Sequence, residues 1–248
     1  MQAAEQAAIA SGIPSFSLME QAGVACAEAA MRIFARGIAL VLCGPGNNGG
    51  DGYVAAKRLR ELGWPVRVMA MLPEGGLKGD AARAAAEWGG PVEPFDPNAI
   101  GDPRFIIDAL FGVGLNRPLD GPAAAMIESV RAKGVAVLAV DVPSGLPGDT
   151  GRPLGPVMQA RATVTFCRKK PAHLLEPGAS LCGQVIVADI GISDSLIEGL
   201  ELKVFENAPE LWAGRLIWPG AGSHKHGRGK LAVWASGPSR GPSLSCGA

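Results

Sequence analysis

Two apolar stretches of the chain each carry an aspartate near their end, followed by a turn that contains glycine. Asp108 stands in Ile107-Asp-Ala-Leu-Phe-Gly-Val-Gly114, and Asp141 stands in Ala139-Val-Asp-Val-Pro-Ser-Gly-Leu146. If both stretches are parallel strands, their carboxyl ends face one binding crevice and the two carboxylates meet there. Either acid alone is equally consistent with a capping or turn residue, so it is the pair that indicates a site.

A glycine-rich loop, residues 42–52, follows another apolar run and opens a segment of helical period. Gly44, Gly46 and Gly49 have the spacing G-x-G-x-x-G, which lets backbone N–H groups and a helix N-terminus approach a pyrophosphate. A tight strand-to-helix turn that simply needs glycine is the alternative. The loop also carries three polar side chains, more than such a turn requires: Asn47, Asn48 and Asp51.

Amide, carboxylate and hydroxyl oxygens gather in the same predicted crevice, on Asn48, Asp108, Asp141 and Ser144. Oxygen ligands suit a hard cation, and the absence of His and Cys from this set disfavours a transition metal. The apolar run Val66 to Met71 does not end in the acid that usually holds an NAD ribose, which disfavours an ordinary dehydrogenase.

The elements that must position these residues follow from short β-branched or aliphatic runs separated by segments of helical period. These runs are Ile38–Cys43, Val66–Met71, Phe105–Leu110, Val135–Val142, Ala162–Phe166 and Gln184–Asp189. The alternation predicts βαβ units and a mostly parallel sheet buried on both faces, that is, an α/β fold. Ser17 and Glu20 have capping-box spacing and predict the start of the first helix.

Composition excludes several classes of protein. Lys plus Arg and Asp plus Glu both number 23, so no basic field indicates nucleic acid or an anionic membrane as partner. No apolar run approaches the length of a membrane span. The five cysteines are scattered, which predicts a reducing, cytoplasmic setting. The apolar pattern weakens after Ile192, so we expect a first domain over 1–205 and a further segment over 206–248.

Five motifs, in order, carry a family resemblance: GPGNNGGDG, DALFGVGLNRPL, AVDVPSGLPGDTG, ATVTFCRKKPAHL and VIVADIGI. With GIPSFSLMEQAG upstream, residues 1–205 resemble the NAD(P)HX epimerase family, also called the YjeF N-terminal domain. The resemblance implies a Rossmann-like three-layer αβα sandwich. It also implies an isomerase that interconverts the R and S epimers at C6 of hydrated NADH and NADPH (NADHX and NADPHX), a nicotinamide nucleotide repair activity.

The resemblance further implies a homodimer and a bound potassium ion. Its potassium ligands fall on Asn48, Asp108 and Ser144. Its substrate-binding positions fall on Asn47, Asn48, Gly49, Gly50, Asp51, Gly112, Val113, Gly114, Leu115, Asn116, Arg117, Pro118 and Asp141. Arg117 is equally consistent with a surface arginine that has no catalytic task. We take Asp141 as the catalytic residue, because one positioned acid can shuttle the proton as the C6 hydroxyl leaves and returns.

Residues 222–237 resemble the opening of the ADP- or ATP-dependent NAD(P)HX dehydratase, a ribokinase-like domain often fused behind this epimerase. Only about forty residues remain there, so we expect a linker and a truncated dehydratase start without dehydratase activity. The ending 239–248 does not resemble the expected continuation, which predicts a truncated or frameshifted reading frame. Lys170 is interpreted as a possible phosphate contact and His173 as a structural residue.

Two other functions stay open on the sequence. A noncatalytic scaffold module of the same fold would not need the four oxygen-bearing residues, all of which are present. An NAD-dependent oxidoreductase would need the ribose-binding acid, which is missing.

Overall fold

The structure is a computed structural model that describes residues 2–115, 117–200, 202, 204–216 and 222. Its centre is a seven-stranded sheet in the order β3-β2-β1-β4-β5-β6-β7, in which every paired neighbour is parallel. The strands are β1 (Ala39–Cys43), β2 (Val66–Ala70), β3 (Glu93–Pro94), β4 (Phe105–Ala109), β5 (Val137–Val140), β6 (Ala162–Phe166) and β7 (Gln184–Ala188). The predicted α/β class is confirmed, and each of the six predicted runs contains a strand.

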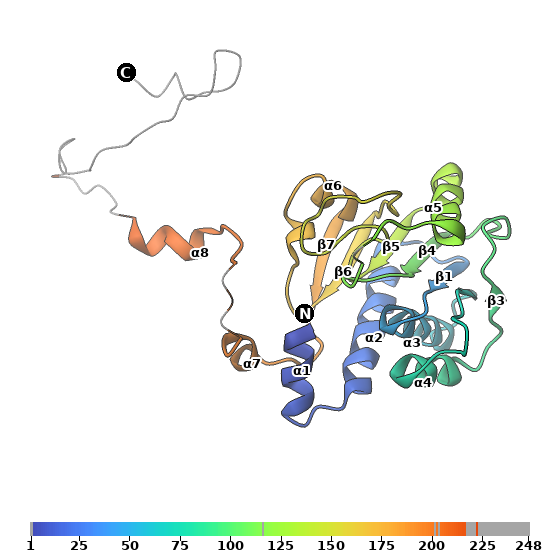
Figure 1. The fold of residues 1–248 in the computed structure, drawn as a ribbon, viewed down its shortest axis with the longest axis horizontal. Coiled ribbons are helices and arrows are strands. Elements are labelled where there is room, and N and C mark those ends of the chain that lie inside the picture. Colours follow the sequence, from blue (N-terminus) through green and yellow to red (C-terminus); the bar gives the residue numbers. More distant parts are fainter. Residues whose placement is uncertain (1, 116, 201, 203, 217–221, 223–248) are drawn as a thin grey trace, which may run out of the picture. The chain divides into compact units, whose positions relative to one another are not determined.

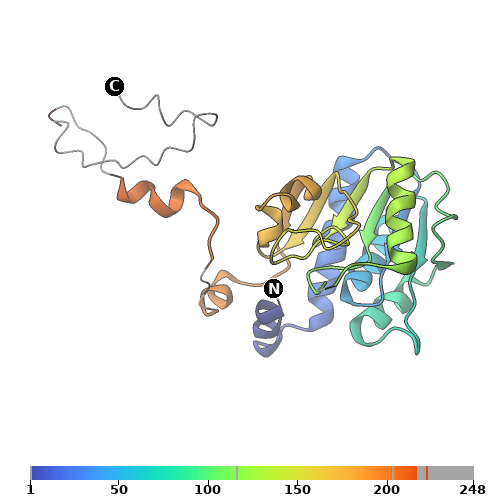
Figure 2. The same ribbon diagram turned by 45° about the horizontal axis from the view of Figure 1, so that its top comes forward.

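Alternate residues of the strands pack on opposite faces of the sheet, as the two-residue period of a strand requires. One face carries α2 (Ser15–Ile33), α3 (Asn47–Glu61) and α4 (Gly79–Trp88), and the other carries α5 (Gly121–Lys133) (Figures 1 and 2). In β1, Val41 belongs to the first core and Leu40 to the second. The result is the three-layer αβα sandwich that the sequence predicts.

Shorter elements complete this unit. They are α1 (Gln2–Ala10), the 3₁₀ helix η1 (Pro171–His173), α6 (Gly178–Cys182) and α7 (Asp194–Glu198). The edge strand β7 is only partly buried, so the expectation of a sheet covered on both faces is wrong there. The predicted capping box is also wrong, because α2 begins at Ser15 after Pro14 and Ser17 lies inside the helix.

The chain divides into two compact units, 1–203 and 204–248. In the second, the structure describes α8 (Pro209–Trp212) and the 3₁₀ helix η2 (Ala213–Arg215). The interpretations of 223–248 lie outside the described residues. Among the described helices, none is long and apolar enough to cross a membrane.

The strand order reverses between β1 and β4, which are neighbours in the sheet although two strands separate them in the chain. At such a point the loops that follow the two strands diverge to opposite faces and leave a crevice outside the carboxyl ends of the strands. The glycine loop follows β1 and the Gly112 segment follows β4. Both of the predicted substrate-binding loops therefore meet at this crevice.

Candidate active site

The glycine loop packs directly against the chain that follows β4. A Cβ added at Gly44 would lie 1.8 Å from the carbonyl oxygen of Leu110, and one added at Gly49 would lie 2.0 Å from the carbonyl oxygen of Gly44. Both distances are impossible for a side chain, so this contact between backbones requires glycine at both positions. The loop then turns into α3 at Gly46, and the first turn of the helix carries Asn47 to Asp51.

Asp108 and Ser144 form a buried pair at the ends of β4 and β5. The Ser144 hydroxyl donates to Asp108 Oδ1 at 2.6 Å, and the Ser144 backbone N–H donates to Asp108 Oδ2 at 2.8 Å. The N–H of Leu110 adds a third hydrogen bond at 3.3 Å. Burial nevertheless raises the pKa of Asp108 to about 6, because the low-dielectric surroundings disfavour the charge more than these hydrogen bonds favour it.

Asn48 and Asp141 face the same space beside Gly112. A Cβ added at Gly112 would lie 3.0 Å from Asn48 Oδ1 and 3.5 Å from Asp141 Oδ2. Asn48 Nδ2 is buried and has no hydrogen-bond partner among the described residues, although buried amides are normally paired. Rotating the amide by 180° exchanges its nitrogen and oxygen, so the unpaired position can present an oxygen to a ligand.

The donor set fits a hard cation. The backbone of Phe111 adds a carbonyl oxygen to the Asp108–Ser144 pair. Its N–H donates to Ser144 Oγ at 3.0 Å, and its carbonyl oxygen lies 3.3 Å from the same hydroxyl. Amide, hydroxyl, carbonyl and carboxylate oxygens are thus available along one short stretch of the crevice, and these are the ligands that hard cations prefer.

Asp141 is held in an unusual conformation by a buried network. Its φ of 65° lies in the left-handed region, which aspartate tolerates better than most residues. Asp141 Oδ1 accepts hydrogen bonds from Lys170 Nζ at 2.5 Å and from Thr165 Oγ1 at 3.0 Å. Lys170 Nζ also donates to Thr165 Oγ1 and to the carbonyl oxygen of Phe166. Oδ1 is therefore engaged, and Oδ2 is the oxygen that faces Gly112.

His173 connects the backbones of Asp141 and Lys170. The Lys170 N–H donates to His173 Nδ1 at 2.9 Å, so the ring proton of the neutral imidazole resides on Nε2. Nε2 lies 2.9 Å from the Asp141 carbonyl oxygen and donates to it. Burial lowers the pKa of His173, which favours this neutral form. His173 thus has a structural role. Lys170 is only 7% exposed and forms an ion pair with Asp141, so in this structure it does not face solvent where a phosphate could bind.

A second buried acid lies in the first turn of α3. Burial raises the pKa of Asp51 well above its ordinary value, and the negative charges of Asp141 and Glu5 raise it further, while Lys170 opposes them. Glu5 of α1 responds in the same way, since burial and then Asp141 raise its pKa. The site therefore combines an ion-paired aspartate with carboxyl groups whose pKa values are raised by burial.

The remaining predicted substrate-binding residues that the structure describes belong to the first turn of α3 and to the segment that follows β4. Gly49 and Gly50 are buried in α3, Gly112, Val113 and Leu115 are half-buried, and Asn47, Gly114, Arg117 and Pro118 are exposed. Asn116 lies outside the described residues. Of the proposed cation ligands, Asp108 and Ser144 are in direct contact, and Asn48 faces the adjoining segment at Gly112.

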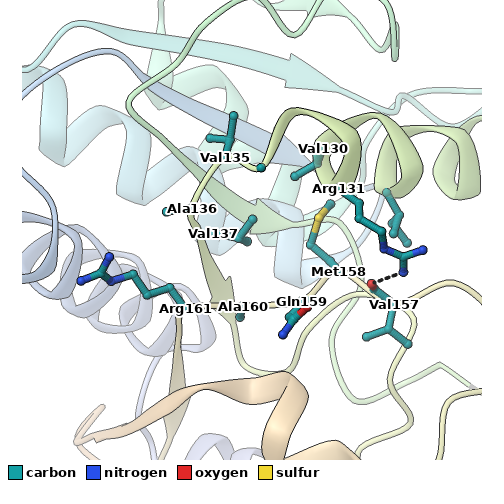
Figure 3. A pocket seen from close by; sticks show the side chains of 12 residues that line it. Val130, Arg131, Val135, Ala136, Val137, Val157, Met158, Gln159, Ala160 and Arg161 are labelled. Carbon is teal, nitrogen blue, oxygen red and sulfur yellow. Dashed lines mark hydrogen bonds between the residues drawn. The ribbon is translucent and has the colours of Figure 1, made fainter.

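A cavity of about 280 Å³ lies away from this chemistry, beside the amino ends of β5 and β6 (Figure 3). It is lined by residues that precede β5 and β6, among them Val135, Gln159 and Arg161. None of the predicted site residues lines it. Because ligands of open α/β sheets bind at the carboxyl ends of the strands, we do not place the active site there.

Sequence reasoning did not find the partners of Asp141. Lys170 and Thr165 follow it by 29 and 24 residues, and Glu5 lies far upstream in α1. The sequence holds no spacing signal for such contacts, since they arise from the pairing of β5 with β6 and from the packing of α1.

The fold and site together define a Rossmann-like α/β domain with a polar site at the carboxyl edge of its sheet. A family model described as "YjeF-related protein N-terminus" matches residues 15–172. The chain belongs to this family.

Named relatives agree with this assignment. The NAD(P)H-hydrate epimerase of Achromobacter xylosoxidans (strain A8) is 45% identical over 183 residues, which are 71% of this chain and 86% of that protein. The NAD(P)H-hydrate epimerase of Limosilactobacillus fermentum is 38% identical over 72% of this chain and 87% of that protein. The crystal structure of yeast ynu0 (YNL200c) has the same fold, with a TM-score of 0.63 at 24% identity, over 79% of this chain and 87% of the yeast chain.

Longer relatives are matched only in part. The bifunctional NAD(P)H-hydrate repair enzyme Nnr of Thermofilum pendens is 38% identical over 211 residues, which are 80% of this chain but 40% of that protein. The chain thus spans less than half the length of this bifunctional relative.

Proposed function

We propose that this chain is an NAD(P)HX epimerase, an isomerase that interconverts the R and S epimers of NADHX and NADPHX. Two relatives, of which this chain covers 86% and 87%, are named NAD(P)H-hydrate epimerase, and NADHX and NADPHX are the hydrates of NADH and NADPH. The observation that carries the proposal is the orientation of the Asp141 carboxylate. Its Oδ1 accepts hydrogen bonds from Lys170 and Thr165, and its Oδ2 faces the crevice beside Gly112. A scaffold module needs no such buried, oriented carboxylate.

The reaction requires one proton to move at one oxygen. The C6–O bond breaks, and its electron pair leaves with the hydroxyl oxygen. The lone pair of the ring nitrogen stabilises the positive charge that develops at C6, and a proton converts the departing hydroxide into water. Water then adds to the opposite face of C6 and gives a proton back. Asp141 Oδ2 gives the first proton to the leaving hydroxyl group and takes the second proton from the entering water, as a positioned general acid or base does. Asp51, with its raised pKa, is the next candidate if Asp141 only binds.

We also propose that Asn48, Asp108 and Ser144 hold a potassium ion. The bound cation would supply positive charge to the crevice, which would favour an anionic nucleotide there. The unpaired buried amide of Asn48 and the Asp108–Ser144 pair support this assignment. We further propose that the protein works as a homodimer in the cytoplasm, a setting that fits the free, buried Cys26, Cys43, Cys167 and Cys182.

The test is Asp141→Asn in an epimerisation assay with pure R-NADPHX. Asparagine is nearly isosteric and also tolerates a positive φ, so the backbone of the site is kept. It cannot carry the proton, and loss of a general acid or base typically lowers turnover by about 10² to 10⁴. Unchanged turnover in the variant would reduce Asp141 to a binding residue, and a wild-type chain without any epimerisation would overturn the proposed function.

A further inference from the structure

The chain that follows β5 carries two of the groups that the proposed function needs. Residues 141–148 begin with Asp141, contain the proposed cation ligand Ser144, and form neither a helix nor a strand. All eight of these residues are nevertheless buried. Irregular chain usually runs over the surface of a protein, because a buried loop must find partners for its backbone outside helices and sheets. The contacts that hold this segment therefore determine where both groups lie.

Two distant stretches of the chain hold the backbone of segment 141–148. The Met158 N–H donates to the carbonyl oxygen of Ser144 at 2.8 Å, and the Ala172 N–H donates to the carbonyl oxygen of Gly148 at 2.9 Å. Ala172 belongs to η1, the 3₁₀ helix whose histidine donates to the Asp141 carbonyl oxygen. The stretch before β6 and the 3₁₀ helix η1 thus both bind the segment through backbone groups.

Leu146 adds a side-chain contact to both stretches. It is fully buried and forms a small core with Val157, Ala172 and Cys182, separate from the two large cores on the faces of the sheet. Val157 directly precedes Met158, and Ala172 lies in η1. Because protein interiors are close-packed, a leucine enclosed in this way fixes the position of the backbone that carries it.

We propose that Leu146 is a positioning residue that couples the cation ligand Ser144 to the Asp141 carboxylate. The inference rests on the proposed function, because that function gives Asp141 the proton transfer and Ser144 the cation. The Leu146 side chain lies in the small core and acts through the chain that it anchors. A displacement of Leu146 therefore moves Ser144 and Asp141 together.

The hydrogen bonds described for the two side chains do not link them directly. Asp141 Oδ1 is held by Lys170 and Thr165, whereas the Ser144 hydroxyl is held by Asp108. The segment that carries both groups thus sets their relative position. A misplacement of about 1 Å can lower a rate about 10²-fold, and loss of a residue that orients a metal ligand typically costs about 10- to 100-fold in metal affinity or activity. The shared anchor predicts that both losses appear in one variant.

The test compares Leu146→Ala with Leu59→Ala in the full chain. Leu59 is equally buried, in the large core near the end of α3 that is remote from the glycine loop. The first measurement is kcat for the epimerisation of R-NADPHX. The second is the potassium concentration that half-saturates the rise in melting temperature, with tetramethylammonium keeping the ionic strength constant.

We expect Leu146→Ala to lower kcat and to raise the half-saturating potassium concentration, each by about 10- to 100-fold. Leu59→Ala should lower the melting temperature to a similar extent, because it also leaves a cavity in a packed core. Its kcat and its potassium dependence should match those of wild type.

Milder variants guard against loss of folding. Leu146→Val removes one methylene group and should show both effects to a smaller degree. Leu146→Met conserves volume, so both measurements should stay near wild type. A lower melting temperature with unchanged kcat and unchanged potassium dependence in the folded Leu146 variants would make Leu146 purely structural and overturn the proposal. A change in one measurement without the other would overturn the coupling.

The inference and the proposed function fail separately, because the potassium measurement needs no turnover. A wild type that responds to potassium without epimerising would remove the epimerase, and a weakened response in Leu146→Ala would still support the anchoring of Ser144. Epimerisation by wild type, with Leu146→Ala indistinguishable from Leu59→Ala, would keep the epimerase and remove the positioning role. A wild-type melting temperature that does not respond to potassium would overturn the coupling.

Discussion

Replacing Lys170 by methionine removes the cation of a buried ion pair while keeping the length of the side chain. The Lys170 and Asp141 side chains are 8% and 10% exposed, so water can do little to stabilise the carboxylate that remains. Breaking a buried pair by removing one partner typically costs about 3–5 kcal/mol. We expect Lys170→Met to lower the free energy of unfolding by about that amount.

Urea unfolding of a double-mutant cycle measures this coupling. Lys170→Met combined with Asp141→Asn removes both charges, so the double variant should recover much of the stability that Lys170→Met alone loses. Lys57→Met is the control, because Lys57 pairs with Glu87 at 2.9 Å but the side chains are 35% and 31% exposed. Such a pair contributes less than about 1 kcal/mol. A loss of that small size for Lys170→Met, with no recovery in the double variant, would refute the reasoning.

Three further predictions address the rest of the site. Gly49→Ala should unfold or grossly distort the loop, because its Cβ would lie 2.0 Å from the Gly44 carbonyl oxygen, whereas Gly46→Ala, with open space around the added atom, should be tolerated in a comparison of melting temperatures. Replacing potassium by tetramethylammonium at constant ionic strength should lower the melting temperature of wild type but not of Asp108→Asn; equal shifts in both would count against the cation site. The lowered pKa of His173 contributes stability that is fully present above its unfolded value of about 6.5 and is lost as the pH falls through the folded value. His173→Gln should therefore flatten the fall of stability below pH 6.5, and an unchanged slope in urea unfolding would exclude His173 as its source.

Much of the fold could be predicted from the sequence because each strand is buried and carries its own apolar run. Ala162–Phe166 was predicted at its observed bounds as β6. The strand β3 was missed since Glu93–Pro94 is two residues long and contains proline, so it has no apolar pattern to detect. The helix start at Ser17 was wrong because Pro14 and the chain entering α2 place the first turn earlier, and a capping-box spacing is local information that packing can override.

Only the part of the site that lies at the ends of the strands could be predicted from the sequence. Asp108, Asp141 and Ser144 follow from the parallel sheet, but the partners of Asp141 do not. The sequence leaves Lys170 as a possible phosphate contact. The structure buries it against Asp141, although lysine is usually exposed. Such a partner depends on the pairing of β5 with β6, and a single sequence carries no trace of which side chains that pairing brings together.

The sheet separates two tasks that the reaction needs. On the β5 and β6 side, Lys170, Thr165 and His173 orient Asp141. These contacts determine the position of the carboxylate oxygen that we propose transfers the proton. On the β1, β2 and β4 side, the backbone loops and an apolar cavity lined by Met71, Phe95 and Phe111 offer surface for a ligand. The Phe111–Ser144 hydrogen bond is where the two sides meet. Substitutions that loosen Asp141 should therefore act on kcat, and substitutions in the cavity should act on KM, because the former change the position of the reacting group and the latter change only the binding of a part of the substrate that does not react.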